Sequence, residues 1–222
     1  MITERYRLLT PDPATPKQVV KTVAEVVKHF DWQCPLGCGF PAVVKHGVVH
    51  TAANVSDQWI GVDAVKMLTE ATYCSPIVML NDADAAGLAE MQFGAGRGRQ
   101  GVVLILTLGT GIGTAMFVNG KLIPNLELGH IEVRGKDAEN RAAESARKRK
   151  GWSWKKWAKH LDEYLIRLED LLWPDLIIIG GGASKKHEKY FHSLSTRTPI
   201  VPAQMLNDAG IVGAALSVMV EQ

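Results

Sequence analysis

The chain has 222 residues, which is enough for one large domain or two small ones. Apolar residues make up 46% of it and charged residues 22%, which excludes a disordered, collagenous or coiled-coil protein. No apolar run approaches the ~18 residues of a membrane span, and we expect neither a membrane segment nor a secretory signal at the start.

The three cysteines are few and odd in number. Cys34, Cys38 and Cys74 therefore suit a reducing cytoplasm better than a disulfide framework. No second cysteine pair or nearby histidine completes a zinc site with Cys34 and Cys38, so we expect no bound zinc.

The net charge of +2 is unevenly distributed along the chain. Residues 134–160 hold ten Lys and Arg against three acidic residues, a local charge of +7 that leaves −5 for the rest. A polyanion would be attracted to this stretch, although a run of charges is usually a solvated helix face.

The first half of the chain predicts helices and short apolar strands in alternation. Thr15-Pro16 is typical of a helix start, and valines at helical spacing follow it as far as Phe30. A short strand is expected at Cys34–Phe40. The other predicted elements are a weakly alternating strand at 4–9, a hairpin of 43–44 and 48–49 around His46-Gly47, a helix at 63–72, a strand at 77–80 and a helix at 83–93.

Glycines at 94–101 predict a flexible connection and the best candidate domain boundary. After it, Val102–Leu108 and Leu176–Ile179 are expected as buried strands. Ser153 is expected to cap a long amphipathic helix that Pro174 ends. A hairpin of 114–118 and 121–123 around Asn119-Gly120 and a small-residue helix at 209–220 complete the prediction.

Two of these strands end in residues that suit ligand contacts, and ligands bind at strand carboxyl ends in open α/β sheets. Asn81-Asp82 pairs an amide with a carboxylate able to accept a hydroxyl proton, although an Asx cap on the next helix explains it equally well. Gly109, Gly111 and Gly113, with the Thr110 hydroxyl, predict a turn whose N–H groups suit phosphate. A plain glycine-rich hairpin is the alternative.

The third strand runs into Gly180-Gly181-Gly182, where glycine permits the close approach of a ligand. Tight packing between the strand and the next element is an equally good explanation. Between the two glycine segments, Glu127 and His130 are spaced to hydrogen-bond a polyol together, although a lone histidine is usually structural. Together these elements predict a phosphoryl-transfer site.

Seven motifs, in order along nearly the whole chain, resemble those of the ROK sugar-kinase family, and within it those of polyphosphate glucokinases. They are FPAVVKHGVVHTAANVSDQWIG (40–61), LNDADAAGLAEMQFGAGRG (80–98), LTLGTGIGTAMFVNG (106–120), ELGHIEV (127–133), GWSWKKWAKHL (151–161), IIIGGGASK (177–185) and NDAGIVGAAL (207–216). The resemblance implies an α/β fold of the actin-like, hexokinase type (ribonuclease H-like), with two domains around a sugar cleft. The expected domains are 1–96, joined by the returning helix 209–222, and 97–208.

The resemblance also implies roles for individual residues. Asp82 is the expected base for the sugar 6-hydroxyl. The expected sugar contacts are Asn54, Asn81, Glu127, His130 and, on spacing alone, Glu139. The expected phosphate and nucleotide contacts are Gly109, Thr110, Gly111, Gly113, Gly181 and Gly182. The implied reaction makes glucose 6-phosphate with Mg²⁺ and polyphosphate or ATP, in a cytoplasmic homodimer without zinc. The sequence does not decide whether the sugar substrate is glucose or mannose, or whether polyphosphate or ATP is the preferred donor.

Two departures from the family pattern affect this reading. The chain lacks the Asp-x-Gly-Gly-x-x-x-Lys motif of the first phosphate loop, and it resembles the family from the third strand onward, so we expect a truncated N-terminal domain. Ala42 also stands where the family usually has glycine. The two explanations are a start assigned too far downstream and an impaired kinase. A catalytically inactive sugar-binding or regulatory relative is the alternative function.

The basic stretch then has an expected partner, a linear polyphosphate. The residues expected to bind it are Arg147, Lys148, Arg149, Lys150, Lys155, Lys156 and Lys159. A nucleic-acid site with tryptophan stacking is disfavoured, because these tryptophans fall on the apolar stripe of the predicted helix.

Overall fold

The computed structural model describes residues 4–53 and 55–220. The chain divides into two compact units: Met1–Asp82 with Ala214–Gln222 (unit 1), and Ala83–Gly213 (unit 2). The expected boundary after residue 96 thus lies inside unit 2. The reason is packing, because a Cβ at Gly87 would overlap the side chains of Ala115 and Phe117, which belong to the unit 2 sheet.

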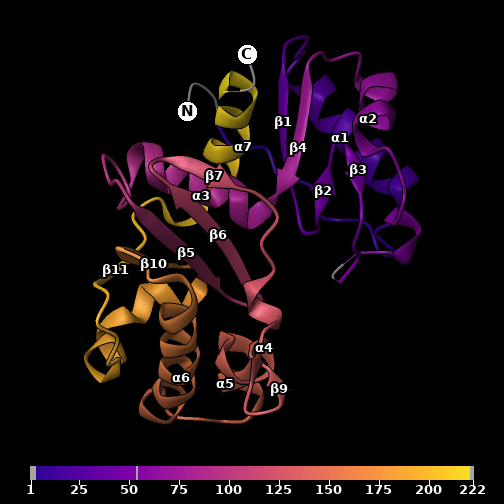
Figure 1. The fold of residues 1–222 in the computed structure, drawn as a ribbon. Helices are drawn as coiled ribbons and strands as arrows, with labels where there is room; N and C mark the ends of the chain where they lie inside the picture. Colours follow the sequence, from indigo (N-terminus) through magenta and orange to yellow (C-terminus); the bar gives the residue numbers. More distant parts are fainter. Residues whose placement is uncertain (1–3, 54, 221–222) are drawn as a thin grey trace. The chain divides into compact units, whose positions relative to one another are not determined.

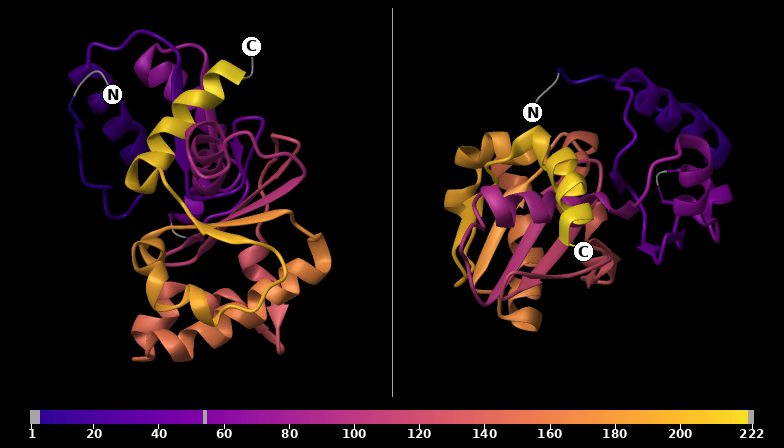
Figure 2. Two further views of the ribbon diagram at one scale, coloured as in Figure 1. Left: turned by 90° about the vertical axis from the view of Figure 1, so that its left-hand side faces the viewer. Right: turned by 90° about the horizontal axis from the view of Figure 1, so that it is seen from above.

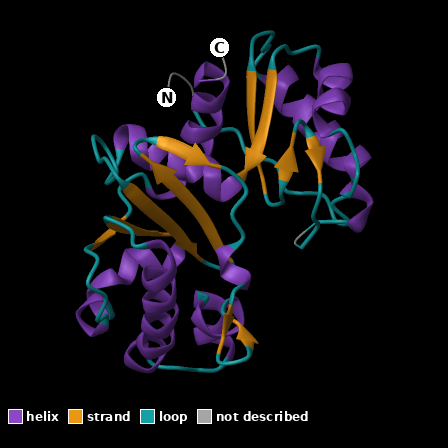
Figure 3. Ribbon diagram, in the orientation of Figure 1, coloured by secondary structure: helices purple, strands orange, loops and turns teal. Residues whose placement is uncertain are grey.

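Unit 1 is built around two short parallel strands and two helices (Figures 1 and 3). Strand β1 (Leu36–Phe40) pairs with β4 (Ile77–Asn81), so that Phe40 lies opposite Asn81. The other elements are α1 (Pro16–His29), the hairpin of β2 (Val44–Lys45) and β3 (Val48–Val49), the 3-10 turn η1 (Asp57–Trp59) and α2 (Ala64–Thr72). Trp59 is fully buried in the core and donates from Nε1 to the Ala14 carbonyl at 2.9 Å.

One of two local predictions for unit 1 needs correction. Residues 4–9, all described, form no strand; Tyr6 instead stacks on His29 of α1 at 3.7 Å between ring centres, and Leu9 is exposed. The helix after Thr15 begins at Pro16 as predicted, with Thr15 at its N-cap position, and the Thr15 hydroxyl donates to Gln18 Oε1 at 2.7 Å.

Unit 2 contains a five-stranded sheet in the order β11-β10-β5-β6-β7. The strands are β5 (Val102–Leu108), β6 (Ile112–Val118), β7 (Lys121–Ile123), β10 (Leu176–Gly180) and β11 (Ile200–Pro202). Strand β5 runs parallel to β10 and antiparallel to β6. The predicted buried strands and the 114–123 hairpin are therefore confirmed.

Helices cover both faces of this sheet (Figure 2). Because side chains alternate along a strand, Leu104 and Leu106 of β5 face the core that contains Trp157 and Leu161 of α6 (Trp154–Leu172). Residues Val103 and Ile105 belong to the other core, against α3 (Asp82–Phe93). A strand buried on both faces has a continuous apolar sequence, which is why β5 was predictable.

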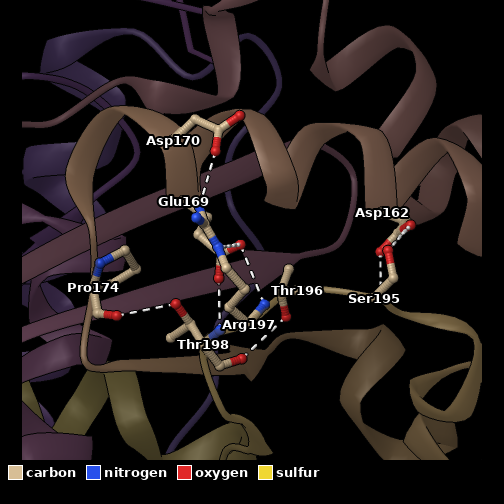
Figure 4. A network of polar contacts seen from close by, with 8 residues as sticks. All are labelled: Asp162, Glu169, Asp170, Pro174, Ser195, Thr196, Arg197 and Thr198. Carbon is tan, nitrogen blue, oxygen red and sulfur yellow. Dashed lines mark hydrogen bonds and ion pairs between the residues drawn. The ribbon is translucent and has the colours of Figure 1, made fainter.

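A polar network joins α6 to residues 195–198, the segment before β11 (Figure 4). Glu169, 3% exposed, accepts the Thr198 N–H at 2.6 Å and the Arg197 Nε–H at 3.0 Å. Burial opposes ionisation, but these hydrogen bonds outweigh it and lower the pKa of Glu169 to about 2. At the other end of the helix, Ser153 accepts the Lys156 N–H as the predicted cap.

Short elements complete unit 2. They are η2 (Leu128–His130), β8 (Glu132–Val133), β9 (Lys136–Asp137), α4 (Glu139–Ala142), α5 (Glu144–Arg149), η3 (Gly182–Lys189), η4 (Phe191–Ser193) and η5 (Leu206–Asp208).

The C-terminal helix α7 (Ala209–Val220) forms as predicted and crosses the division of the chain. Within unit 1, the Gly37 backbone lies against the Ala214 carbonyl, and within unit 2, Gly213 lies against Ala85. Each contact requires glycine, since a Cβ would overlap backbone atoms. In the described part of the chain, no helix is both long and apolar enough to cross a membrane.

Candidate active site

The carboxyl ends of β5 and β10 bring the two predicted glycine segments together. The strands are parallel neighbours, and Gly180 lies opposite Thr107. The next residue, Gly181, has φ +76 and packs so tightly on the Leu108 backbone that a Cβ there would lie 2.5 Å from the Leu108 carbonyl oxygen. Gly109–Gly113 and Gly181–Gly182 therefore share one edge of the sheet, as ligand-binding turns in α/β sheets do.

Packing within the protein accounts for most of these glycines. A Cβ at Gly111 would overlap the Glu139 carboxylate, and one at Gly113 would lie 2.8 Å from Ala83 Cβ. At Gly182 a Cβ would lie 2.9 Å from Glu144 Oε2. Gly109 is different, because a Cβ there would meet no atom of the described residues within 4 Å.

A continuous chain of contacts runs from the Gly109–Gly113 turn to the predicted polyol contacts. The Ile112 N–H donates to Glu139 Oε2 at 2.8 Å, and the Glu139 N–H donates to Asp137 Oδ1 at 3.0 Å. The other Asp137 oxygen lies 2.8 Å from His130 Nδ1, and His130 Nε2 lies 3.8 Å from Glu127 Oε2.

The histidine in this chain is held in one orientation by its neighbours. The hydrogen bond with Asp137 raises the pKa of His130, and partial burial opposes this only in part. Because a carboxylate only accepts, Nδ1 carries the proton on the side of Asp137, and Nε2 faces Glu127. Both Glu127 and His130 are exposed, so they remain accessible to a polar ligand.

Buried polar groups fix the segment that carries Glu127. The Thr114 hydroxyl donates to the Leu126 carbonyl at 2.6 Å and accepts the Leu128 N–H at 3.2 Å. Asp84, 1% exposed, accepts the Asn125 N–H at 2.8 Å. The position of Glu127 is thus set by β6 and α3, which are themselves packed in the core.

The predicted base and its neighbour stand at the end of β4. Asn81 is buried in unit 1 and donates from Nδ2 to the Ala42 carbonyl at 3.3 Å. Asp82 is exposed and begins α3, while the next residue, Ala83, packs on Gly113 in unit 2. The remaining predicted sugar contact, Asn54, lies outside the described residues.

The predicted polyphosphate contacts begin next to the glycine turns. Glu144 is buried and pairs with Lys148 at 3.2 Å and with Arg147 at 3.7 Å. The Arg147 guanidinium lies 4.0 Å from the centre of the Trp154 ring. Arg149, Lys150, Lys155, Lys156 and Lys159 are exposed.

The tryptophans of this region are packed by the chain itself. Trp157 is fully buried, and the Lys150 and Lys156 ammonium groups lie 4.5 and 5.4 Å from the Trp152 ring centre. Trp154 stacks on Tyr190 at 5.5 Å between ring centres. These contacts agree with core packing as the role expected for the tryptophans.

Two residues near the site were not predicted. Asp137 reaches His130 because the Arg134-Gly135 turn, with φ of +54 and +68, folds β9 back on β8. Ser145 binds the Gly109 and Thr110 carbonyls through its N–H and hydroxyl. The only sequence signal for either is the glycine of a two-residue hairpin turn, which places Asp137 opposite Glu132.

Similar proteins of known family identify the fold. The chain is 53% identical to the "Polyphosphate glucokinase" of Mycobacterium tuberculosis (strain CDC 1551 / Oshkosh) over 217 residues, 98% of this chain and 82% of that protein. The crystal structure of an inorganic polyphosphate/ATP-glucomannokinase from an Arthrobacter species superposes with a TM-score of 0.93 at 47% identity, covering 100% of this chain and 90% of that one.

A more distant structure shares the fold alone. The ROK family glucokinase from Streptomyces griseus has a TM-score of 0.78 at 22% identity over 96% of this chain and 90% of that one. The predicted actin-like, hexokinase-type fold is confirmed by these likenesses. The ROK family pattern itself matches residues 1–145. On sequence and structure alike, the chain belongs to the ROK family.

Proposed function

We propose that this chain transfers a phosphoryl group from inorganic polyphosphate or ATP to the 6-hydroxyl of glucose, giving glucose 6-phosphate. The observation that carries the proposal is the contact chain from Ile112 through Glu139, Asp137 and His130 to Glu127. It connects a turn suited to phosphate with side chains suited to sugar hydroxyls, and phosphoryl transfer depends mainly on such relative positioning. The similarity to polyphosphate glucokinases supports the same reaction.

In the proposed reaction, Glu127 and His130 bind sugar hydroxyls, Asn54 and Asn81 add contacts, and Asp82 takes the proton from the attacking 6-hydroxyl. Glu139 accepts the Ile112 N–H and so holds the glycine turn in place. Its predicted contact with the sugar is a second, separate role. The protein itself binds the N–H groups of Gly109 and Ile112, and other N–H groups of the Gly109–Gly113 turn stabilise the charge that develops on the transferred phosphoryl group. Gly181 and Gly182 border the donor.

Mg²⁺ is the metal that the family implies. In residues 4–53 and 55–220 no group of three or more His, Cys, Asp or Glu is placed to hold a metal ion. In proteins Mg²⁺ usually binds through substrate phosphates, waters and one or two carboxylates. Asp82 is an exposed carboxylate at the end of β4 that would contact the ion, and the ion would neutralise charge on the donor.

The basic residues extend the proposed donor site. Arg147 and Lys148 belong to α5, two and three positions after Ser145, the residue that binds the glycine turn. In this proposal a linear polyphosphate whose end lies at the turn continues along the basic stretch, which begins at Arg147 and Lys148. Arg149, Lys150, Lys155, Lys156 and Lys159 serve the following phosphates by electrostatic attraction. Cytoplasmic location and a homodimer stay predictions.

The test is glucose 6-phosphate formation by the wild type and by Asp82→Asn, with Mg²⁺ and either polyphosphate or ATP. We expect turnover by the wild type and a loss of about a hundredfold to ten-thousandfold in Asp82→Asn, the usual contribution of a general base. Glucose affinity, measured by calorimetry, should change little. Sugar binding by a wild type without turnover from either donor would instead identify a non-catalytic relative.

A further inference from the structure

Ser145 makes two hydrogen bonds to the glycine turn. Its backbone N–H donates to the Gly109 carbonyl at 3.0 Å, and its hydroxyl donates to the Thr110 carbonyl at 2.5 Å. Both carbonyls are therefore held on the side of the turn that faces α5.

The orientation of these carbonyls fixes the direction of two N–H groups. The peptide bonds that join Gly109, Thr110 and Gly111 are trans, since the cis bonds of the described chain are at Pro13 and Pro76. In a trans peptide the C=O and the following N–H point in opposite directions. With the two carbonyls bound by Ser145, the N–H groups of Thr110 and Gly111 point away from α5, side by side. Successive N–H groups in a turn form an anion-binding concavity.

We propose that Ser145 is a positioning residue for the phosphoryl donor: it orients the Thr110 and Gly111 N–H groups so that they bind phosphate oxygens. The inference rests on the proposed function, because it assigns those N–H groups to the donor. Ser145 itself does not touch the donor. It acts through the two carbonyls.

The second glycine turn shows the same arrangement. The Ser184 hydroxyl donates to the Gly181 carbonyl at 2.8 Å, and Ser184 is buried. By the same peptide geometry, the Gly182 N–H points away from Ser184. Two serines in separate segments thus bind carbonyls at the neighbouring ends of β5 and β10. In both turns the N–H groups that follow these carbonyls point the other way, which supports a role for them in ligand binding.

The test compares Ser145→Ala, which loses the hydroxyl, with Ser145→Thr, which keeps it. Tripolyphosphate and glucose binding are measured by calorimetry with Mg²⁺, and KM is measured separately for each substrate. We expect Ser145→Ala to raise the Kd for tripolyphosphate and the KM for ATP about fivefold, which equals about 1 kcal/mol, the contribution of one hydrogen bond. Ser145→Thr should stay near the wild type, and glucose affinity should stay unchanged in both.

Ser195→Ala is the matched control. Its hydroxyl also makes one hydrogen bond within unit 2, to Asp162 Oδ2 at 2.8 Å, but it lies in the loop before β11. We expect no change in donor affinity for this variant. A general loosening of the fold would lower glucose and donor affinity together, and would contradict the inference.

The remaining outcomes separate this inference from the proposed function. A wild type that binds tripolyphosphate while Ser145→Ala binds it equally well overturns the role of Ser145 alone. The role of Ser145 is also overturned if Ser145→Thr binds tripolyphosphate as weakly as Ser145→Ala does. A wild type that neither binds tripolyphosphate nor forms glucose 6-phosphate overturns both.

Discussion

Gly109 offers the sharpest separation of function from folding, because a side chain there has room in the folded protein. A Cβ at this position would meet no described atom within 4 Å, and the backbone lies outside the left-handed region. Gly109→Ala should therefore leave the fold intact. It should raise the free energy of unfolding by about 0.4–1 kcal/mol, because alanine reduces the entropy of the unfolded chain.

Although Gly109→Ala should stabilise the fold, it should weaken binding of the phosphoryl donor. The added methyl group stands on the residue before the Thr110 N–H, on a side that no described atom fills. If a phosphate oxygen approaches that N–H, the methyl group displaces it and removes one hydrogen bond to a charged group. Such a bond contributes about 1.5–3 kcal/mol, so the donor KM should rise about tenfold to a hundredfold.

The assay measures donor KM, glucose KM and thermal unfolding for Gly109→Ala and for Gly111→Ala. The second variant is the matched comparison, because its Cβ would overlap the Glu139 carboxylate and should lower the melting temperature. The reasoning is refuted if Gly109→Ala keeps the wild-type donor KM. It is equally refuted if that variant unfolds at a lower temperature, since the open space would then not exist.

Two further predictions concern the charged groups. Replacing Lys155, Lys156 and Lys159 by Gln should raise the polyphosphate KM and weaken its salt dependence, with a milder effect on the KM for ATP; an unchanged polyphosphate KM would contradict the proposed path. Its control is the same replacement of three exposed lysines of α1 (Lys17, Lys21 and Lys28), which should leave both KM values unaltered. The lowered pKa of Glu169, about 2, stabilises the fold above the ordinary carboxyl pKa by about 3 kcal/mol, and this stability should be lost as the pH falls towards 2. Unfolding by urea between about pH 6 and pH 2.5 should show a shallower pH dependence in Glu169→Gln than in the wild type or in Asp170→Asn; equal slopes in all three would count against this.

Secondary structure was predictable wherever burial imposes a pattern on the sequence. Strand β5 is buried on both faces and reads as a continuous apolar run, and α6 shows one stripe of apolar residues facing the sheet. The segment 4–9 has the opposite character. Its weak alternation leaves Tyr6 and Leu8 only half-buried, and the segment pairs with no described strand.

The division of the chain was not predictable from composition. Glycines at 94–101 suggested a linker, but the structure uses them to turn the chain after α3. Buried Glu90 accepts the Ala95 N–H at 2.9 Å there, and a Cβ at Gly94 would overlap its carboxylate. The division falls instead between Asp82 and Ala83, at a strand-to-helix junction that has no unusual composition. A glycine-rich segment can thus indicate tight packing as well as flexibility.

The same ambiguity explains what the sequence left open at the candidate site. Packing or phosphate binding was an equal choice for the Gly180–Gly182 segment, and the structure supplies a packing reason for both Gly181 and Gly182. At Gly109 an added Cβ would meet no described atom within 4 Å, so this glycine carries the stronger indication of a ligand. The role of Ser145 could not be predicted from the sequence for a different reason. Its role depends on where two carbonyls point, and a peptide orientation is set by the folded turn and by no local residue pattern.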